Sequence, residues 1–286
     1  MTENIPNWLL AIDVDRTLLT SEYKLLPKVQ AAVQHAREHR VTVALVTARG
    51  PRALDVVIGE LGDIDYAVCF GGALSVVRGD GRWLSHESSA EETLHRDVCR
   101  ELIDFCRSIG LSLALYGRDF VYVDELDGHL ANEFKHTGDI YKVRDLQSIE
   151  ERPFKFLAIC NPGRVDKLDA VKARFDGRLS CAMSHANYLE IGPKGISKAS
   201  GLAALGNRIS IGPERTAAIG DGENDLPMFE YARISIAMGN APQSVRGAAT
   251  WVTLGNAEAG VAAAIERLSR EIWHIPGPNY LVEENE

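Results

Sequence analysis

The sequence predicts an α/β protein built on an open, mostly parallel β-sheet. Short apolar runs alternate with helical patterns at both ends of the chain. These runs are continuous rather than alternating, which fits strands buried on both faces. Strand–helix alternation of this kind is typical of an open α/β sheet. The expected strands cover residues 8–12, 41–46, 66–70, 216–219, 234–237 and 251–252.

Helices are expected between these strands. Residues 27–39 carry apolar side chains at helical spacing. Pro51 should open a second helix and Gly62 should end it, since proline favours the first turn and glycine the C-cap. Similar patterns cover residues 226–232 and 258–268, so the alternation holds at both ends of the chain.

The middle of the chain predicts a separate α+β module. Residues 89–92, Ser-Ala-Glu-Glu, form a capping box ahead of a helix that reaches Ile109 and stops at Gly110. Residues 111–116 and 120–123 should pair as a hairpin. A further helix is expected at residues 165–175. Three further strands are expected at residues 154–160, 179–183 and 188–191.

These patterns predict two domains. Residues 1–81 and 187–286 would form the α/β core, and residues 82–186 would form an α+β domain inserted into it. The chain would leave the core after the Gly-Asp-Gly segment at residues 79–81.

The composition argues against several classes of protein. The chain has 286 residues, and 31 Lys and Arg against 40 Asp and Glu give a formal net charge of −9. This balance leaves no broad basic surface, so nucleic acid is not expected as a main partner. No apolar run reaches the roughly 18 residues that span a membrane, and the N-terminus lacks signal-peptide features. Five cysteines without a Cys-x-x-Cys pair indicate a reducing compartment, so a cytoplasmic protein is expected.

Polar residues directly after the apolar runs are the first candidates for a site, because ligands of open α/β sheets bind beyond the strand ends. Asp13 and Asp15 follow the first run and share a face of an extended segment. Two close carboxylates suit a nucleophile beside a general acid, a Mg²⁺ site, or both. They could also simply end the strand.

Two further segments carry single candidates. Thr47, in Thr-Ala-Arg, follows a predicted strand, so its hydroxyl could help to hold a phosphate or serve only as a helix-entry residue. Lys198 begins a predicted helix and could neutralise a phosphoryl oxygen, although a lysine at such a place is ordinarily a solvated surface residue.

The segment at residues 220–225, Gly-Asp-Gly-Glu-Asn-Asp, carries the strongest single signal. Its two glycines expose backbone beside the carboxylates of Asp221 and Asp225 and the amide of Asn224. Oxygen donors clustered in this way are the ligands that hard cations such as Mg²⁺ prefer.

Together, these four segments resemble the haloacid dehalogenase-like superfamily of aspartate-nucleophile phosphatases, in particular its Cof-type, sugar-phosphatase-like branch. The resemblance spans nearly the whole chain in the right order. It also includes Ala-Met-Gly-Asn-Ala at residues 237–241 and Asn-x-Glu-x-Gly-Val at residues 256–261. The family implies a Rossmann-like, mostly parallel core with an inserted type-2 cap.

The resemblance implies a role for each candidate. Asp13 would be the nucleophile that forms an aspartyl-phosphate, and Asp15 would protonate the leaving oxygen and later activate water. The Mg²⁺ ligands would be Asp13, Asp15 through its backbone carbonyl, and Asp221, with Asp225 supporting them. Thr47 and Lys198 would bind the phosphoryl group, and Asn224 would contact it or the metal site. The substrate would be a small phosphorylated metabolite such as a sugar phosphate.

The spacing of the motifs indicates where a cap would be inserted. Only 34 residues separate Asp13 from Thr47, whereas 151 separate Thr47 from Lys198, which leaves room for the α+β module. A cap of this kind would exclude water and contact the leaving group. Its polar candidates are Arg118, Asp119, Lys155 and His185.

The chain departs from the family pattern at three places. Arg16 stands where glycine is usual, and we expect it to avoid the glycine conformation, redirect the loop, or add a positive group to the pocket. Phe70-Gly71-Gly72-Ala73 replaces a usual Asn-Gly-Ala, and Lys198 is followed by Ala199 rather than glycine. The essential charged residues persist, so an active phosphatase is expected. A phosphomutase and a catalytically silent binding or regulatory protein with the same fold are the alternatives.

Overall fold

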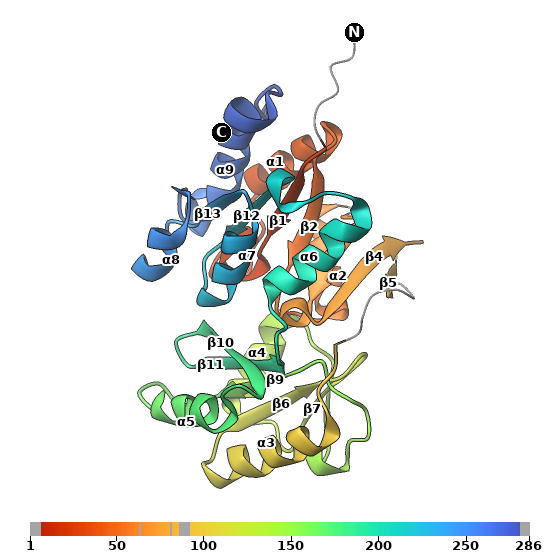
Figure 1. The fold of residues 1–286 in the computed structure, drawn as a ribbon, viewed down its shortest axis with the longest axis vertical. Coiled ribbons are helices and arrows are strands. Elements are labelled where there is room, and N and C mark those ends of the chain that lie inside the picture. Colours follow the sequence, from red (N-terminus) through yellow and green to blue (C-terminus); the bar gives the residue numbers. More distant parts are fainter. Residues whose placement is uncertain (1–6, 63, 81, 86–91, 281–286) are drawn as a thin grey trace, which may run out of the picture.

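The structure is a computed structural model that describes residues 7–62, 64–80, 82–85 and 92–280. It contains a large sheet and a small sheet, which occupy the upper and lower parts of Figure 1. The first six strands of the large sheet, in spatial order, pair in parallel, as expected for the predicted α/β class, and its last two pair antiparallel. In spatial order the strands are β14 (Trp251–Val252), β13 (Ile234–Ala237), β12 (Thr216–Gly220), β1 (Leu9–Ile12), β2 (Thr42–Val46), β3 (Tyr66–Cys69), β4 (Leu74–Gly79) and β5 (Arg82–Ser85).

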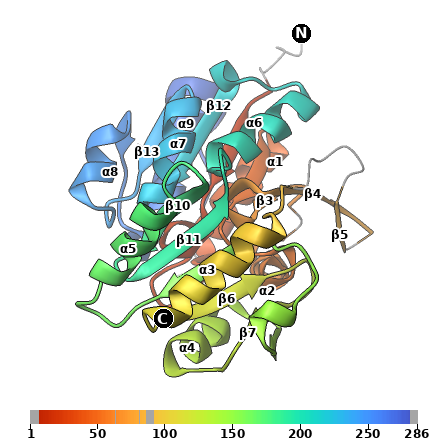
Figure 2. The ribbon, with the colours of Figure 1, turned by 60° about the horizontal axis from the view of Figure 1, so that its bottom comes forward.

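Helices cover both faces of the large sheet (Figures 1 and 2). Alternate residues of β1 point to opposite faces, so Leu10 and Ile12 join one core while Leu9 and Ala11 join the other. All four are fully buried, which is why the apolar run is continuous. One face packs against α1 (Pro27–Glu38), α2 (Pro51–Leu61) and α9 (Gly260–Leu268), and the other against α6 (Lys198–Ile209), α7 (Leu226–Tyr231) and α8 (Gln243–Ala248).

Two details of the large sheet differ from the expectation. The strand expected at residues 66–70 ends at Cys69, because Phe70 turns to a left-handed φ of 52°. The antiparallel pair β4 and β5 was not predicted. Its strands are only partly buried and contain arginine and serine, so they lack the continuous apolar character that marked the other strands.

The small sheet has six strands and is mostly antiparallel. The hairpin expected between residues 111–116 and 120–123 is present, and its turn is closed by a hydrogen bond from the Gly117 N–H to the Phe120 carbonyl at 3.0 Å. In spatial order the strands are β10 (Leu179–His185), β11 (Tyr188–Pro193), β9 (Lys155–Ile159), β6 (Ser112–Tyr116), β7 (Val121–Val123) and β8 (Tyr141–Val143).

Two helices, α3 (Arg96–Ser108) and α5 (Asp166–Phe175), pack on one face of the small sheet. The capping box expected at residues 89–92 includes residues outside the described part of the chain, and α3 begins later, at Arg96. Helix α4 (Gly128–Thr137) and strand β8 were not predicted. The signal for α4 is its N-cap, because the Asp127 carboxylate accepts the N–H groups of His129 and Leu130 at 2.9 Å.

The division into domains at residues 82 and 187 stays a prediction. Strand β5, which begins at residue 82, pairs within the large sheet, and strand β11, which begins at residue 188, pairs within the small sheet. We refer below to strands β6–β11 with helices α3–α5 as the small-sheet unit.

An aromatic contact joins the large sheet to the small-sheet unit. Phe70, directly after β3, stacks on Phe154, directly before β9, with ring centroids 4.7 Å apart and planes 7° from parallel. The Tyr116 ring of β6 meets the edge of the same Phe70 at 6.4 Å. The left-handed backbone at Phe70 therefore turns its ring out of the sheet and onto the neighbouring unit.

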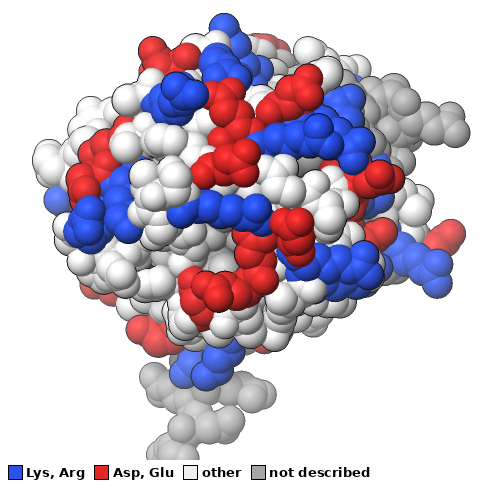
Figure 3. All heavy atoms as spheres, turned by 90° about the horizontal axis from the view of Figure 1, so that it is seen from below, with Lys and Arg blue, Asp and Glu red and all other residues white. Residues whose placement is uncertain are grey.

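The surface agrees with the composition. Acidic and basic side chains are interspersed on the face seen in Figure 3, which shows no uniformly basic area. The five cysteines are free thiols, and four of them are buried as small apolar groups. Among the described residues, no helix combines the length and apolar character that a membrane crossing requires.

Candidate active site

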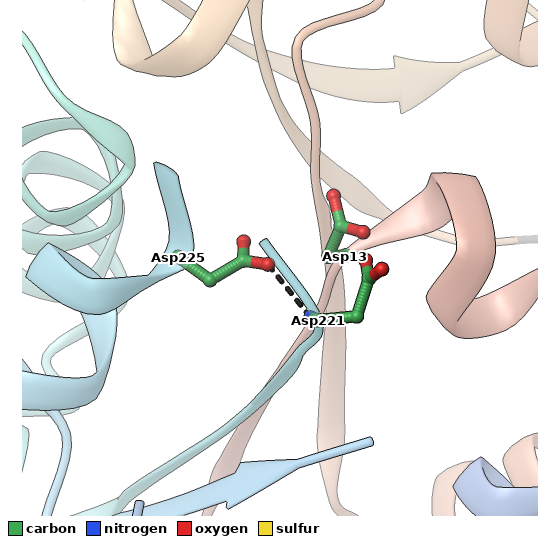
Figure 4. Close-up of side chains that lie close together, drawn as sticks. All are labelled: Asp13, Asp221 and Asp225. Atoms are coloured by element: carbon green, nitrogen blue, oxygen red, sulfur yellow. Dashed lines mark hydrogen bonds between the residues drawn. The ribbon is translucent and has the colours of Figure 1, made fainter. Parts of the chain in front are cut away.

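The site begins where two neighbouring central strands end. Strands β1 and β12 pair in parallel although their residues lie far apart in the sequence, with Leu9 opposite Thr216. The N–H of Asp13 continues this pairing by donating to the Ile219 carbonyl at 3.0 Å. Carboxylate oxygens of Asp13, Asp221 and Asp225 lie within 4.8 Å of one another (Figure 4).

Asp225 holds the loop that carries Asp221. One Asp225 oxygen, Oδ2, accepts the backbone N–H groups of Asp221 and Gly222, both at 2.9 Å. A side chain on Gly220 would collide with the Asp225 carboxylate, so glycine is needed there for the close approach. The sequence Gly-Asp-Gly-Glu-Asn-Asp thus folds into a turn that directs two carboxylates to one place.

Lys198 lies inside the carboxylate cluster. Its Nζ donates to Asp13 Oδ1 at 2.5 Å and to Asp225 Oδ1 at 2.6 Å, and the residue is only 2% exposed. The alternative that Lys198 is a solvated surface residue is therefore wrong. Burial alone would lower the pKa of Lys198, but the charges of Asp13 and Asp225 outweigh it and raise the pKa, so the ammonium group stays charged.

Burial and the neighbouring negative charges raise the pKa values of two carboxyl groups in the cluster even with this lysine present. Burial raises the pKa of Asp13 well above its usual range, and the negative charges of Asp225 and Asp221 add to the effect against the pull of Lys198. Burial and Asp225 also raise the pKa of Asp221 to about 6. Such a cluster has an excess of negative charge that a cation would relieve.

Asp15 points to a different partner. Arg49 Nε and Nη2 donate to its two carboxylate oxygens at 2.9 and 2.6 Å, in the two-pronged geometry that arginine favours. Burial would raise the pKa of Asp15, but the hydrogen bonds and charge of Arg49 outweigh it and lower the pKa. Arg49 is itself 5% exposed and is further held by the carbonyls of Ala53 and Thr137 at 3.4 Å.

The expectation that Arg16 avoids the glycine conformation is wrong. Its φ is 61° and its ψ 8°, the left-handed region that glycine adopts without cost. The loop keeps its shape, and the side chain adds a positive group, with Nε 3.7 Å from Asp221 Oδ2. The next residue, Thr17, donates its hydroxyl to the other oxygen of Asp221 at 3.2 Å.

Thr47 and Asn224 differ in their access to the site. Asn224 lines the cavity described below, together with Asp13 and Asp221. Thr47 is fully buried, and its Oγ1 accepts the Arg49 N–H at 3.1 Å. The structure therefore places Thr47 beneath the loop rather than in the cavity wall.

An open cavity lies between this site and the small-sheet unit. Asp13, Asp15 and Arg49 form its wall on the side of the large sheet. Of the four polar candidates expected in the small-sheet unit, Lys155 and His185 line this cavity, whereas Arg118 and Asp119 line others. The remaining residues of the small-sheet wall are Tyr116, Glu133, Thr137, Asp139, Ser184, Tyr188 and Glu190.

The small-sheet wall is rich in charge. Lys155 on β9 is 4% exposed, and its Nζ donates to Glu190 Oε2 on β11 at 2.7 Å. Ser184 donates to the other oxygen of Glu190 at 3.0 Å. Burial, reinforced by the charges of Asp15 and Glu190, raises the pKa of Glu133 to about 7. These donors and acceptors line the cavity together with Asp13 and Asp15.

Several site residues were missed in the sequence. Asn240 donates to the Arg16 carbonyl at 3.1 Å, and its amide oxygen accepts the Asn256 N–H at 2.9 Å. Both lie in the segments that carried the family resemblance, which was the available signal. Glu133 and Asp139 carried none, because they lie in and beside α4, which was itself not predicted.

Comparisons with known proteins cover nearly the whole chain. The family model of the haloacid dehalogenase-like hydrolases matches residues 10–265. YitU, a 5-amino-6-(5-phospho-D-ribitylamino)uracil phosphatase of Bacillus subtilis, is 26% identical over 262 residues, which cover 89% of this chain and 95% of the relative. Phosphatase YwpJ of the same organism is 27% identical over 285 residues, covering 91% and 99%. A haloacid dehalogenase-like hydrolase from Bacteroides thetaiotaomicron has a crystal structure with a TM-score of 0.79 and 26% identity, covering 92% and 99%.

Proposed function

Because the chain belongs to the haloacid dehalogenase-like hydrolases, we propose that it is a Mg²⁺-dependent phosphatase that hydrolyses a phosphate monoester through an aspartyl-phosphate on Asp13. The predicted family is confirmed by this match, and the predicted class of enzyme, a phosphatase, by the named relatives. The observation that carries the proposal is the convergence of Asp13, Asp221 and Asp225 around the buried ammonium group of Lys198.

The carboxylate cluster fits a divalent cation. Its donors are oxygens only, and burial together with the neighbouring carboxylates raises the pKa values of Asp13 and Asp221, so a hard cation would stabilise their ionised forms. Asp13, the backbone carbonyl of Asp15, and Asp221 would be the ligands. Both oxygens of Asp225 already accept hydrogen bonds, so Asp225 would support the site by holding Lys198 and the Asp221 loop. When bound, Mg²⁺ would neutralise phosphate oxygens and let the dianion approach a carboxylate.

The residues divide the reaction between them. Asp13 would attack the phosphorus atom while Asp15 gives a proton to the leaving oxygen, and water activated by Asp15 would then hydrolyse the aspartyl-phosphate. Lys198 would hold a phosphoryl oxygen together with Asn224, and Thr47 would support the phosphate site from beneath the loop through its hydrogen bond with the Arg49 N–H. In its pair with Arg49, Asp15 is a carboxylate suited to activating water. The negative charge of a bound phosphate dianion would raise the pKa of Asp15. Asp15 could then carry the proton that it gives to the leaving oxygen in the first step.

The substrate would be a small phosphorylated metabolite, such as a sugar phosphate or a related compound. The named substrate of the relative YitU carries a phosphate on a ribityl chain, and the cavity wall of the small-sheet unit offers donors and acceptors suited to hydroxyl groups. We therefore propose that the small-sheet unit is the cap, which contacts the leaving group and excludes water.

The test is Mg²⁺-dependent release of inorganic phosphate from p-nitrophenyl phosphate and from a panel of sugar phosphates, phosphoglycerates and nucleotides. Free phosphate separates a hydrolase from a phosphomutase, which returns the phosphate to another hydroxyl. If the protein turns over none of these compounds at any Mg²⁺ concentration, the proposal is refuted. The alternative of a catalytically silent binding protein is then favoured.

Replacing Asp221 by Asn should remove the metal-dependent activity, with a loss of at least about 100-fold, because one charged ligand is lost. The fold should persist, since the amide still accepts the Thr17 hydroxyl and one repelling charge is gone. Thermal unfolding with and without Mg²⁺ checks both points. Mg²⁺ should stabilise the wild type and an Asp55→Asn control, but not Asp221→Asn. Full activity of Asp221→Asn would contradict the metal assignment.

Replacing Arg49 by Met should reduce kcat by about 100-fold, because Asp15 loses the partner that orients it and keeps it ionised. Without that partner, burial raises the pKa of Asp15. As pH falls, Asp15 therefore takes up a proton, and stops activating water, at a higher pH than in the wild type. The acidic limb of the kcat–pH profile should therefore move to higher pH. Arg52→Met is the control, since Arg52 pairs with Asp119 outside the site. An unmoved acidic limb would show that Arg49 does not tune Asp15.

A further inference from the structure

Arg16 combines a strained backbone with an exposed charge. Its left-handed φ of 61° is unfavourable for a residue other than glycine. The backbone is held in place, because the Arg16 carbonyl accepts the Asn240 amide at 3.1 Å and Asn240 in turn accepts the Asn256 N–H at 2.9 Å. Strain kept in this way at the edge of a reaction site favours a role for the side chain.

The side chain of Arg16 is placed to move. It is 41% exposed, and its Nε lies 3.7 Å from Asp221 Oδ2, beyond hydrogen-bond distance. The attraction is therefore one of charge without fixed geometry. The residue also lines the same cavity as Asp13 and Asn224, where the phosphate group of a substrate would lie.

Within the cluster, Asp221 pairs with Arg16 rather than with Lys198. Lys198 meets Asp13 and Asp225, and in the described part of the chain Arg16 is the cation paired with Asp221. A divalent cation bound to Asp221 would compete with this guanidinium and repel it. A phosphate dianion in the cavity would offer the displaced guanidinium a new partner.

We propose that Arg16 couples metal binding to phosphate binding: when the metal binds Asp221, the Arg16 guanidinium leaves Asp221 and pairs with the phosphate group. The inference rests on the proposed function. It also explains why arginine stands at a position whose backbone conformation favours glycine. Its consequence is that the metal binds weakly alone and more tightly together with phosphate.

The experiment measures Mn²⁺ binding by electron paramagnetic resonance and calorimetry, with and without inorganic phosphate, so that no turnover is needed. Arg16→Gln removes the charge but keeps the length of the side chain. It should bind Mn²⁺ alone roughly tenfold more tightly than the wild type, as expected for removal of one charge near a dication. Phosphate should tighten Mn²⁺ binding several-fold in the wild type and by less in Arg16→Gln. Arg16→Lys should behave like the wild type, and Arg52→Gln controls for the loss of an arginine charge outside the site.

Two outcomes separate this inference from the proposed function. If Asp221→Asn loses Mn²⁺ binding but Arg16→Gln matches the wild type with and without phosphate, the coupling role of Arg16 is overturned while the metal site stands. If Asp221→Asn binds Mn²⁺ as the wild type does, the metal lies elsewhere, and both the site assignment and the role of Arg16 fail.

Discussion

Replacing Asp13 by Asn should lower kcat by about four orders of magnitude or more, the scale seen when a covalent nucleophile is removed. The amide cannot form the acyl phosphate, although it matches the carboxylate in shape. Binding of a phosphate analogue should survive in part, because Lys198 keeps its contact with Asp225. The measurement is kcat for the best substrate of the panel at saturating Mg²⁺.

The fold of this variant should be intact. Asp13 is buried in a cluster that raises its pKa, so exchanging it for a neutral group removes repulsion as well as its bond to Lys198. We expect an unfolding temperature close to that of the wild type, which makes the loss of activity a loss of chemistry. Activity within tenfold of the wild type would show that another residue is the nucleophile.

Replacing Lys198 by Met should have the largest effect on stability. Lys198 and Asp225 are 2% and 0% exposed, and both carboxylates bound by the ammonium group would lose their partner. Removing one member of a buried ion pair costs about 3–5 kcal/mol. Because the folded-state pKa of Lys198 is raised, the titration of Lys198 itself removes this stabilisation only at pH values above the unfolded pKa near 10.5.

Urea unfolding at several pH values checks this prediction. The deficit of Lys198→Met should shrink as pH falls, because Asp13, with its raised pKa, takes up a proton and no longer needs a charged partner. Lys194→Met is the matched control, since Lys194 is exposed in the turn before α6 and should change stability little. Equal stability of the two variants would contradict the role given to the Lys198 ion pairs.

The sequence was sufficient to predict the part of the fold that depends on local patterns. The run ending at Ile12 is apolar throughout because both faces of β1 are covered, and this identified the strand and the polar residue after it. Four segments, each placed after a strand or at the start of a helix, then predicted most of the candidate cluster. The exposed pair β4 and β5 and the polar helix α4 lacked such patterns, so they were not predicted.

The partners of the site residues could not be predicted in the same way, because they depend on distant parts of the chain. Arg49 meets Asp15 across 34 residues, and Lys198 meets Asp13 across 185. A lysine at a helix start looks the same in sequence whether it faces solvent or a carboxylate. The conformation of Arg16 was predicted wrongly for a related reason, since Asn240, from the far end of the chain, holds its carbonyl by a hydrogen bond.

The pairing of β1 with β12 has a consequence for the protein during its synthesis. Once residues 42–46 have left the ribosome, β1 can pair with β2 on one side, but its other neighbour, β12, begins only at Thr216. Asp221 and Asp225 lie directly after β12 or shortly beyond it. The ribosome therefore makes these two groups of the cluster about 200 residues later than Asp13, the nucleophile candidate. A nascent chain shorter than this therefore carries Asp13 on an open strand edge, where it depends on protection from aggregation and has no catalytic capacity.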